Sequence, residues 1–108
     1  MELNEYQHKA MTIAQYPHVG DNIVYPVLGM TGEAGEIANK VKKIQRGDYA
    51  LTPEVRLDLA KEIGDVLWYC AVLAVEIGYE LDDVAKYNLD KLKVRKENNT
   101  IKGSGDNR

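Results

Sequence analysis

Apolar residues recur every three or four positions over most of this 108-residue chain, which is the period of an amphipathic helix. The pattern is longest between Pro53 and Ile77. Thr52 is well suited to cap the start of this helix, Pro53 to occupy its first turn, and Gly78 to end it. Because no strand pattern alternates with the helical one, the sequence predicts an all-α fold.

The N-terminal segment shows the same period and is predicted to be helical from about Glu5 to Tyr16. Asn4 is the expected N-cap, with Gln7 three residues later in a capping-box pattern. Pro17 cannot continue the helical hydrogen bonds. Both ends of this helix are therefore marked in the sequence.

A further helix is expected from about Pro26 to Gln45, closed by Gly47. Its first half carries three glycines, each of which costs about 1 kcal/mol of helix propensity relative to alanine. A helix of this kind is expected to have a reason for small residues, either a closely packed backbone or a ligand. The three positions are Gly29, Gly32 and Gly35.

The last predicted helix begins at Leu81, is opened by the acidic Asp82 and Asp83, and ends near Arg95. Residues 96–108 are polar, have almost nothing to bury, and are predicted to be disordered. The folded domain is therefore expected over residues 1–95 as a four-helix, bundle-like unit.

Size and charge restrict the partners of such a chain. A domain of 108 residues has a thin core, which favours pairing with a second copy as a homodimer or as a homotetramer built from two dimers. The net charge of -3 at pH 7 argues against a nucleic-acid partner. No apolar run approaches the roughly 20 residues of a membrane-spanning helix, so no membrane partner is expected. The single cysteine, Cys70, favours a reducing compartment and predicts a cytoplasmic protein.

Two pairs of acidic residues stand at the same spacing, Glu33 with Glu36 and Glu62 with Asp65. Residues three apart lie on one face of a helix, and antiparallel packing of the two helices would bring all four carboxylates together. Four such groups in an apolar groove would raise one another's pKa values unless a cation neutralised them. Oxygen ligands without histidine or cysteine favour Mg²⁺, or else Mn²⁺, over zinc. The alternative is that both pairs are solvated surface charges.

Further polar side chains follow the same helical faces. Lys40 comes seven residues after Glu33, and Tyr69 comes four residues after Asp65. On the last predicted helix, three polar residues stand at positions i, i+3 and i+7, namely Asn88, Lys91 and Arg95. Cations, an amide and a phenol near a bound metal ion would suit a phosphate-bearing ligand. Taken singly, each of the three cations is better explained as a solvated surface group, so this interpretation depends on the set as a whole.

The residues that carry these patterns resemble a known family. Residues 32–43 and 61–69 resemble the E-x-x-E and E-x-x-D signature of the MazG-like nucleotide pyrophosphohydrolases. Residues 88–92, together with Arg95, are similar to the closing motif of that family. The resemblance extends over roughly residues 3 to 95, and the tail after Lys96 lies outside it.

This resemblance implies an all-α enzyme that uses magnesium to hydrolyse nucleoside triphosphates, canonical or modified, to the monophosphate and pyrophosphate, in a role that cleans the nucleotide pool. It implies four metal ligands, Glu33, Glu36, Glu62 and Asp65. It implies contacts with phosphate or sugar from Lys40, Tyr69, Asn88, Lys91 and Arg95. Many relatives carry an extra glutamate where this chain has Gly32, which leaves the number of metal ions open.

Glu36 is the expected general base of this hydrolysis, and Lys40 the expected catalytic cation. Trp68 is expected to contact the substrate, because aromatic surface near the site is suited to recognise the base. The other aromatic candidates are Tyr6, Tyr16 and Tyr25, and the alternative for all four is the core, where such residues more often lie.

Two other classes of protein remain as alternatives. One is a noncatalytic helical module that forms homo-oligomers or binds a partner through its apolar faces, and it should bind no metal ion at micromolar to low-millimolar concentration. The other is a di-iron bundle, which is disfavoured because neither His8 nor His18 stands in a Glu-x-x-His spacing. Both histidines are expected to be ordinary residues.

Overall fold

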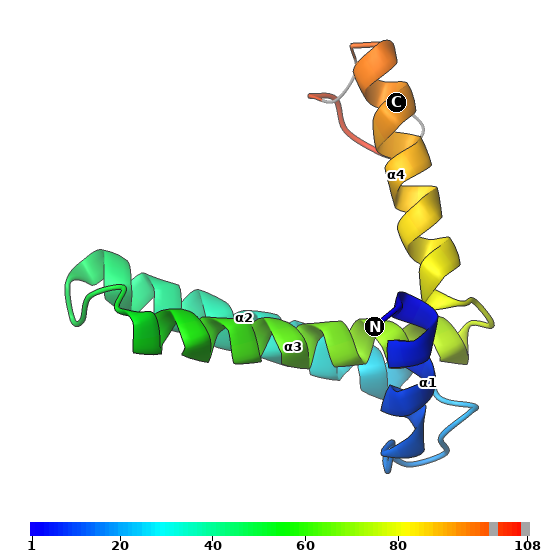
Figure 1. Ribbon diagram of the computed structural model, residues 1–108, viewed down its shortest axis with the longest axis horizontal. Coiled ribbons are helices and arrows are strands. Elements are labelled where there is room, and N and C mark those ends of the chain that lie inside the picture. Colours follow the sequence, from blue (N-terminus) through cyan, green and yellow to red (C-terminus); the bar gives the residue numbers. More distant parts are fainter. Residues whose placement is uncertain (100–101, 107–108) are drawn as a thin grey trace.

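The computed structural model describes residues 1–99 and 102–106, and these residues form four helices with no strand (Figure 1). The helices are α1 (Leu3–Thr12), α2 (Val24–Arg46), α3 (Pro53–Glu76) and α4 (Leu81–Glu97). They account for 71% of the described residues. The predicted all-α fold is therefore confirmed.

Helices α2 and α3 run antiparallel, side by side, and form a long hairpin (Figure 1). The turn between them follows local rules. Gly47 ends α2 with a left-handed backbone (φ 92°), and Thr52 Oγ1 accepts a hydrogen bond from Val55 N at 3.2 Å. Pro53 occupies the first turn of α3, where its missing N–H costs nothing. The sequence predicted this end of the hairpin correctly.

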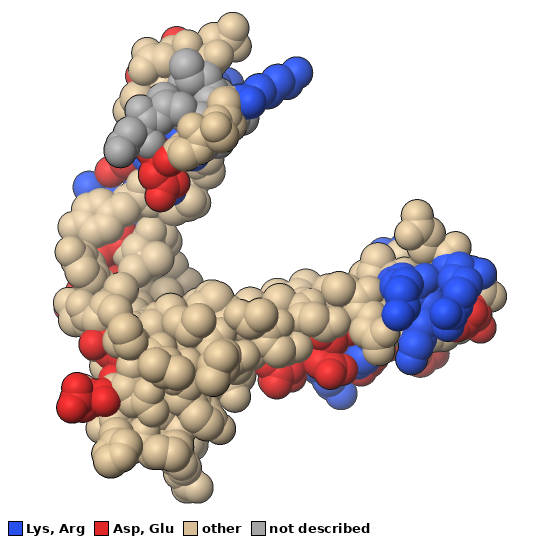
Figure 2. All heavy atoms as spheres, turned by 180° about the vertical axis from the view of Figure 1, so that it is seen from behind, with Lys and Arg blue, Asp and Glu red and all other residues tan. Residues whose placement is uncertain are grey.

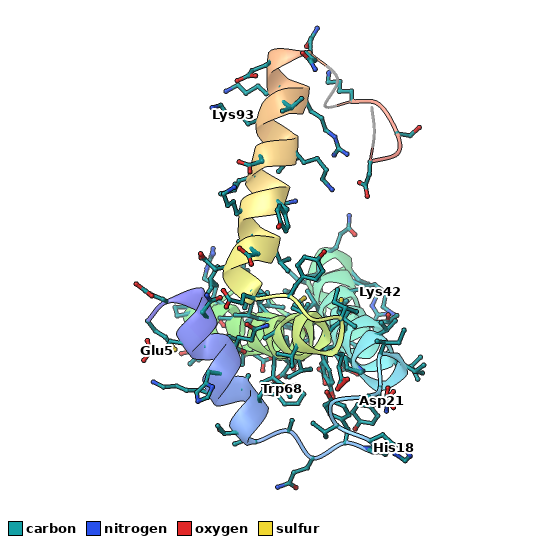
Figure 3. The ribbon with its side chains drawn as sticks, turned by 90° about the vertical axis from the view of Figure 1, so that its right-hand side faces the viewer. Glu5, His18, Asp21, Lys42, Trp68 and Lys93 are labelled. Atoms are coloured by element: carbon teal, nitrogen blue, oxygen red, sulfur yellow. The ribbon has the colours of Figure 1, made fainter. Side chains whose placement is uncertain are left out.

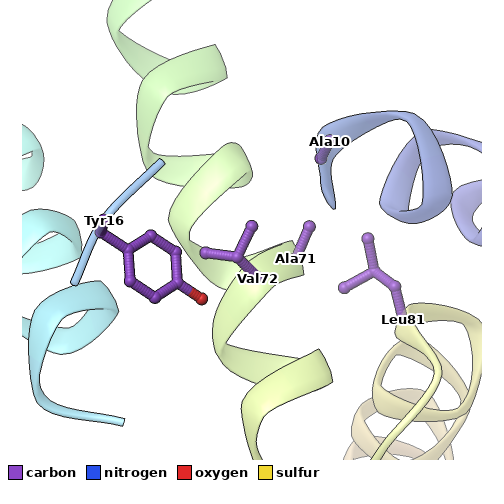
Figure 4. Close-up of a cluster of buried hydrophobic side chains, with 5 residues drawn as sticks. All are labelled: Ala10, Tyr16, Ala71, Val72 and Leu81. Atoms are coloured by element: carbon purple, nitrogen blue, oxygen red, sulfur yellow. The ribbon is translucent and has the colours of Figure 1, made fainter. Parts of the chain in front are cut away.

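The core lies at the opposite end of the hairpin, where α1 packs across the C-terminal half of α3 (Figure 4). Five buried side chains form it, Ala10, Tyr16, Ala71, Val72 and Leu81. They come from α1, the connection that follows it, α3 and the first residue of α4. This small core joins three helices at one point and leaves most of the hairpin length outside it.

Helix α1 differs from its prediction at both ends. It begins at Leu3 and ends at Thr12, so the predicted end at Tyr16 is wrong. Residues 13–23 form a connection, because Tyr16 turns into the core and its hydroxyl donates to Glu76 at 2.7 Å. Tertiary contacts therefore override the helical period in this segment.

The predicted capping box at the start of α1 is also wrong. Asn4 Oδ1 accepts a hydrogen bond from Asp82 N at 2.9 Å, and Gln7 Oε1 accepts one from Leu81 N at 3.0 Å. The side-chain amide of Gln7 donates to Tyr79 O at 3.0 Å. Helix α4 has no side-chain cap from its own N-cap residue. Helix α1 instead supplies acceptors for N–H groups in the first turn of α4, which have no partner within their own helix.

Glu76 holds the connection between α1 and α2 against α3. Its carboxylate accepts hydrogen bonds from the Tyr16 hydroxyl, from Gly20 N at 2.6 Å and from Asn22 N at 2.9 Å. Burial alone would raise the pKa of Glu76, but these hydrogen bonds outweigh it and lower the pKa. The carboxylate is therefore held in its charged form, and it fixes the path of the chain into α2.

Helix α4 leaves the hairpin at an elbow and projects away from it (Figure 1). Among the described residues it packs against α1 and α3 but not against α2. Apolar side chains on this arm stay exposed, including Tyr87 at 56% and Leu89 at 66%. No helix in the described ranges has the length and apolar character needed to cross a membrane.

Candidate metal centre

Three carboxylates meet midway along the hairpin. Glu33 comes from α2, and Glu62 and Asp65 come from neighbouring turns of α3. One oxygen atom of each lies within 4.8 Å of the others. The antiparallel packing of α2 and α3 creates this cluster, because it sets the middle of one helix beside the middle of the other.

The charges of this acid cluster (Glu33, Glu62 and Asp65) act on one another. Glu33 is half-buried, and desolvation followed by the charges of Asp65, Glu62 and Glu36 raises its pKa above the ordinary value. Carboxylate oxygens are the ligands preferred by Mg²⁺ and Mn²⁺, and a divalent cation would remove this repulsion. The donor set therefore fits such an ion.

Glu36 lies just outside the acid cluster. Its side chain is exposed, and its oxygens are not among those that converge within 4.8 Å. Its charge nevertheless contributes to the raised pKa of Glu33, so it lies close by. The structure thus brings three of the four predicted ligands together and places the fourth at their edge.

Lys40 reaches the acid cluster from α2. Its ammonium nitrogen lies 2.8 Å from Glu62 Oε1 and 2.6 Å from Asp58 Oδ2. Hydrogen bonds to Asp58 and then to Glu62 raise the pKa of Lys40, so it stays charged. Asp58 was not predicted as a site residue, although its place one helical turn before Glu62 was a signal that could have identified it.

Tyr69 lies between the acid cluster and the aromatic residues at the base of the hairpin. Burial raises its pKa, and the neighbouring Tyr25, Glu33 and Asp65 raise it further. A Cβ atom added at Gly29 would overlap the Tyr69 ring, so the ring lies directly on the backbone of α2. This contact explains one of the three glycines of α2. Gly32 and Gly35 have nothing within 4 Å of an added Cβ.

The other aromatic residues form a chain of ring contacts. Tyr16 and Tyr25 stack with ring centroids 5.1 Å apart, Tyr25 meets Tyr69 at 6.5 Å, and Trp68 meets Tyr69 edge-on at 5.1 Å. Trp68 also packs against the buried core, on the side of α3 that carries α1 (Figure 3). Tyr6 lies near Asp65, since burial and then the charge of Asp65 raise its pKa.

Comparison with known proteins agrees with this centre. Residues 26–100 match the family model of the MazG nucleotide pyrophosphohydrolase domain, a range that covers α3, α4 and all but the first two residues of α2. The chain belongs to the MazG family. It is also 48% identical, over an alignment of 114 positions that covers the full length of both chains, to the gene 37 protein of Mycobacterium phage L5. No solved structure was found to match it.

Members of the MazG family generally depend on a divalent metal ion, which is consistent with the acid cluster of this chain. The matched region continues past the predicted domain end at Arg95 as far as residue 100. It includes the last residue of α4, Glu97. The disorder predicted for residues 96–108 concerns in part residues 100–101 and 107–108, which lie outside the described residues.

The residues predicted to form the closing motif of the family do not join the acid cluster within one chain. They lie on the α4 arm, which rises from one side of the hairpin, while the acidic side chains along the hairpin lie on the other side (Figure 2). Asn88 and Lys91 border an open groove of about 400 Å³ whose remaining walls are Ile77, Tyr79, Val84 and Tyr87. The divergence of the arm from the hairpin separates the two sets.

Lys91 and Arg95 already hold a carboxylate in this structure. Asp106 Oδ1 lies 3.0 Å from Lys91 Nζ and 3.3 Å from Arg95, whose guanidinium also donates to Gly105 O and Asp106 O. Both cations lower the pKa of Asp106, the Lys91 hydrogen bond having the larger effect. The pair is therefore arranged to bind an anionic oxygen.

Proposed function

We propose that this chain hydrolyses nucleoside triphosphates to the monophosphate and pyrophosphate in a Mg²⁺-dependent reaction, with Mn²⁺ as a possible substitute. The observation that carries the proposal is the convergence of Glu33, Glu62 and Asp65 from two helices of a MazG domain. Glu36 is proposed as the fourth ligand or as the general base. The biological role we propose is removal of unwanted nucleotides, canonical or modified, from the pool of a reducing compartment such as the cytoplasm.

Bound Mg²⁺ would neutralise charge on the triphosphate and assist water in attacking phosphorus. Glu33, Glu62 and Asp65 would hold it, since their oxygens already lie within 4.8 Å of one another. Glu36, exposed beside the cluster, is free to take a proton from the attacking water. Lys40 would neutralise phosphate oxygens at the edge of the cluster.

Substrate recognition is proposed to use Tyr69 and Trp68 near the acid cluster. Asn88, Lys91 and Arg95 are proposed to contact phosphate or sugar in the site of a second copy, because α4 diverges from the hairpin of its own chain. From residue 81, Lys91 lies about 15 Å along α4, by a rise of about 1.5 Å per residue, and this carries it away from α2. The active form is therefore proposed to be a homodimer or a homotetramer.

Exposed apolar residues support this assembly. On α2 and α3 they include Val27 at 44%, Leu28 at 66%, Ile63 at 58% and Leu67 at 39% exposure. Figure 2 shows a mostly uncharged surface along the hairpin, between its base and the basic cluster at its tip. Exposed apolar side chains on a surface with few charges are typical of a protein interface. The same observation favours the alternative function, a noncatalytic homo-oligomeric module.

Product analysis separates the two functions. The purified protein is incubated with a panel of canonical and modified ribo- and deoxyribonucleoside triphosphates, with Mg²⁺ or EDTA, and the products are resolved by ion-exchange chromatography. Monophosphate and pyrophosphate, absent with EDTA and with Glu62→Gln but retained with Glu54→Gln, are the expected result. Diphosphate with orthophosphate would overturn the reaction, and no turnover of any nucleotide would favour the noncatalytic module.

A further inference from the structure

Lys40 is shared between two carboxylates, only one of which belongs to the acid cluster. Its ammonium nitrogen lies 2.6 Å from Asp58 and 2.8 Å from Glu62. The Lys40 and Glu62 side chains are only 24% and 17% exposed, whereas Asp58 is 52% exposed. Lys40 therefore links a carboxylate inside the cluster to one at the solvent edge.

Glu62 has two competing uses in this arrangement. Its carboxylate is one of the three that would hold a divalent ion, and it also accepts a hydrogen bond from the ammonium of Lys40. A divalent ion and an ammonium repel each other, so tight binding of the ion requires the ammonium to withdraw from Glu62. Lys40 is half-buried, so an ammonium withdrawn from Glu62 needs another acceptor, because an unpaired charge there is costly.

Asp58 is that acceptor. It precedes Glu62 by four residues on α3, so the two carboxylates lie on one helix face, one turn apart. Its distance to Lys40 is already the shorter of the two. The backbone of Lys40 is held as well, since the Tyr49 hydroxyl donates to Lys40 O at 3.1 Å. Only the end of the lysine side chain has to move.

We propose that Asp58 is a positioning residue for Lys40, and that it holds the ammonium when Glu62 binds the metal ion. The inference rests on the metal site of the proposed function and adds a residue to it. Asp58 strengthens metal binding by more than its own charge, because without it Glu62 is the only acceptor that the described residues offer to the Lys40 ammonium. It also keeps the ammonium beside the cluster, where an oxygen of a phosphate group can reach it.

A double-mutant cycle on metal binding tests the proposal without using turnover. Mn²⁺ affinity is measured by electron paramagnetic resonance or titration calorimetry for the wild-type protein, Asp58→Asn, Lys40→Met and the double variant. Asp58→Asn is expected to weaken Mn²⁺ binding about fivefold or more, and Lys40→Met to tighten it severalfold. In the Lys40→Met background, Asp58→Asn is expected to cost about twofold or less, because only its charge is then lost.

Two further variants serve as controls. Glu54→Gln removes one negative charge from the first turn of α3, outside the acid cluster and the Lys40 pairs, and is expected to leave Mn²⁺ affinity within about twofold of wild type. Asp58→Glu retains a carboxylate and is expected to recover most of the affinity lost in Asp58→Asn. It also gives a second test if the asparagine variant folds poorly, as judged by circular dichroism.

The outcomes separate the positioning role from the metal site. An equal loss on Asp58→Asn with and without Lys40 would overturn the positioning role and leave the metal site intact. No binding of Mn²⁺ by the wild-type protein would overturn the metal site and, with it, the proposed function. A coupled loss that Asp58→Glu reverses supports both.

Discussion

The α2–α3 hairpin and the α4 arm present opposite arrangements of charge. In the hairpin, three carboxylates meet at close range, desolvation and then the neighbouring carboxylates raise the pKa of Glu33, and one lysine partly compensates for the negative charge. On the arm, Lys91 and Arg95 converge on a single carboxylate and lower its pKa. The hairpin thus offers ligands for a cation, and the arm offers partners for an anion. A metal–triphosphate substrate needs both kinds of site, yet one chain holds them apart.

The largest effect is expected from Glu33→Gln, which tests the cation-binding half of this comparison. Loss of one metal ligand should lower hydrolysis by about 100-fold or more. In EDTA the same variant should melt at an equal or higher temperature, because the charge removed is one that its neighbours repel. Activity assays and thermal unfolding by circular dichroism measure the two effects. A variant that melts far lower without metal would contradict the repulsion described for the cluster.

The sign of the pH dependence follows from the same pKa shift. The pKa of Glu33 in the folded protein lies above its ordinary value of 4.5, so ionisation of Glu33 destabilises the fold. The stability gained by Glu33→Gln should therefore be absent below the ordinary pKa of 4.5 and should grow as the pH rises through the folded pKa. Melting curves at several pH values in EDTA measure this gain in stability. A gain that did not depend on pH would point to a cause other than the ionisation of Glu33.

A smaller effect, but a more direct test of the separation, is expected from subunit mixing. Glu62→Gln and Lys91→Ala are each expected to be nearly inactive alone. If the arm of one copy serves the hairpin of another, a mixture that exchanges subunits should regain about a quarter of the wild-type activity, since about a quarter of the sites are then intact. A mixture that remains inactive after verified exchange would show that arm and hairpin act within one chain.

Gln7→Ala is expected to weaken the joint between the two regions. The substitution leaves the Leu81 N–H and the Tyr79 carbonyl without their side-chain partner at a buried position. Such losses cost about 1–3 kcal/mol of unfolding free energy. Urea unfolding followed by circular dichroism measures it, with the exposed neighbour His8→Ala as the matched control. Equal stability of the two variants would mean that the hydrophobic core alone holds the arm.

The smallest effect is expected from Asp106→Asn. The Asp106 side chain is 80% exposed, so the loss of its two ion pairs should leave the free energy of unfolding unchanged. It competes with phosphate for Lys91 and Arg95, so its removal should lower the KM for the triphosphate by about twofold to threefold. Steady-state kinetics at low salt measures the change, with Ser104→Ala as control. An unchanged KM would show that the two cations do not meet substrate.

The sequence was informative where structure depends on near neighbours. Thr52, Pro53 and Gly47 fix their helix ends through atoms a few residues away, and all three acted as predicted. Asn4 and Gln7 have polar partners more than 60 residues away, so their local capping-box pattern was misleading. Nothing in the neighbourhood of either residue indicates that α1 would cap α4.

The candidate site was likewise predictable where it depends on local spacing and not where it depends on tertiary packing. Spacing predicted the acid pairs, but a step of three residues advances a helix by about 300°, which places Glu36 about 60° around the axis of α2 from Glu33. Its exposed side chain is the result. The direction of α4 depends on the elbow at residues 77–80 and on tertiary packing, which a periodic pattern does not encode. The separation of Lys91 from the acid cluster was therefore not predictable from the motif.

The Tyr69 ring that rests on Gly29 fixes the axial alignment of the two helices. Only glycine leaves room for the ring at that point of α2, so sliding either helix by one turn, about 5.4 Å, would drive the ring into a side chain. Glu33 stands four residues after Gly29 on the same helix, and Asp65 four residues before Tyr69 on the other. A contact that carries no charge of its own thus keeps the two halves of the acid cluster level with each other.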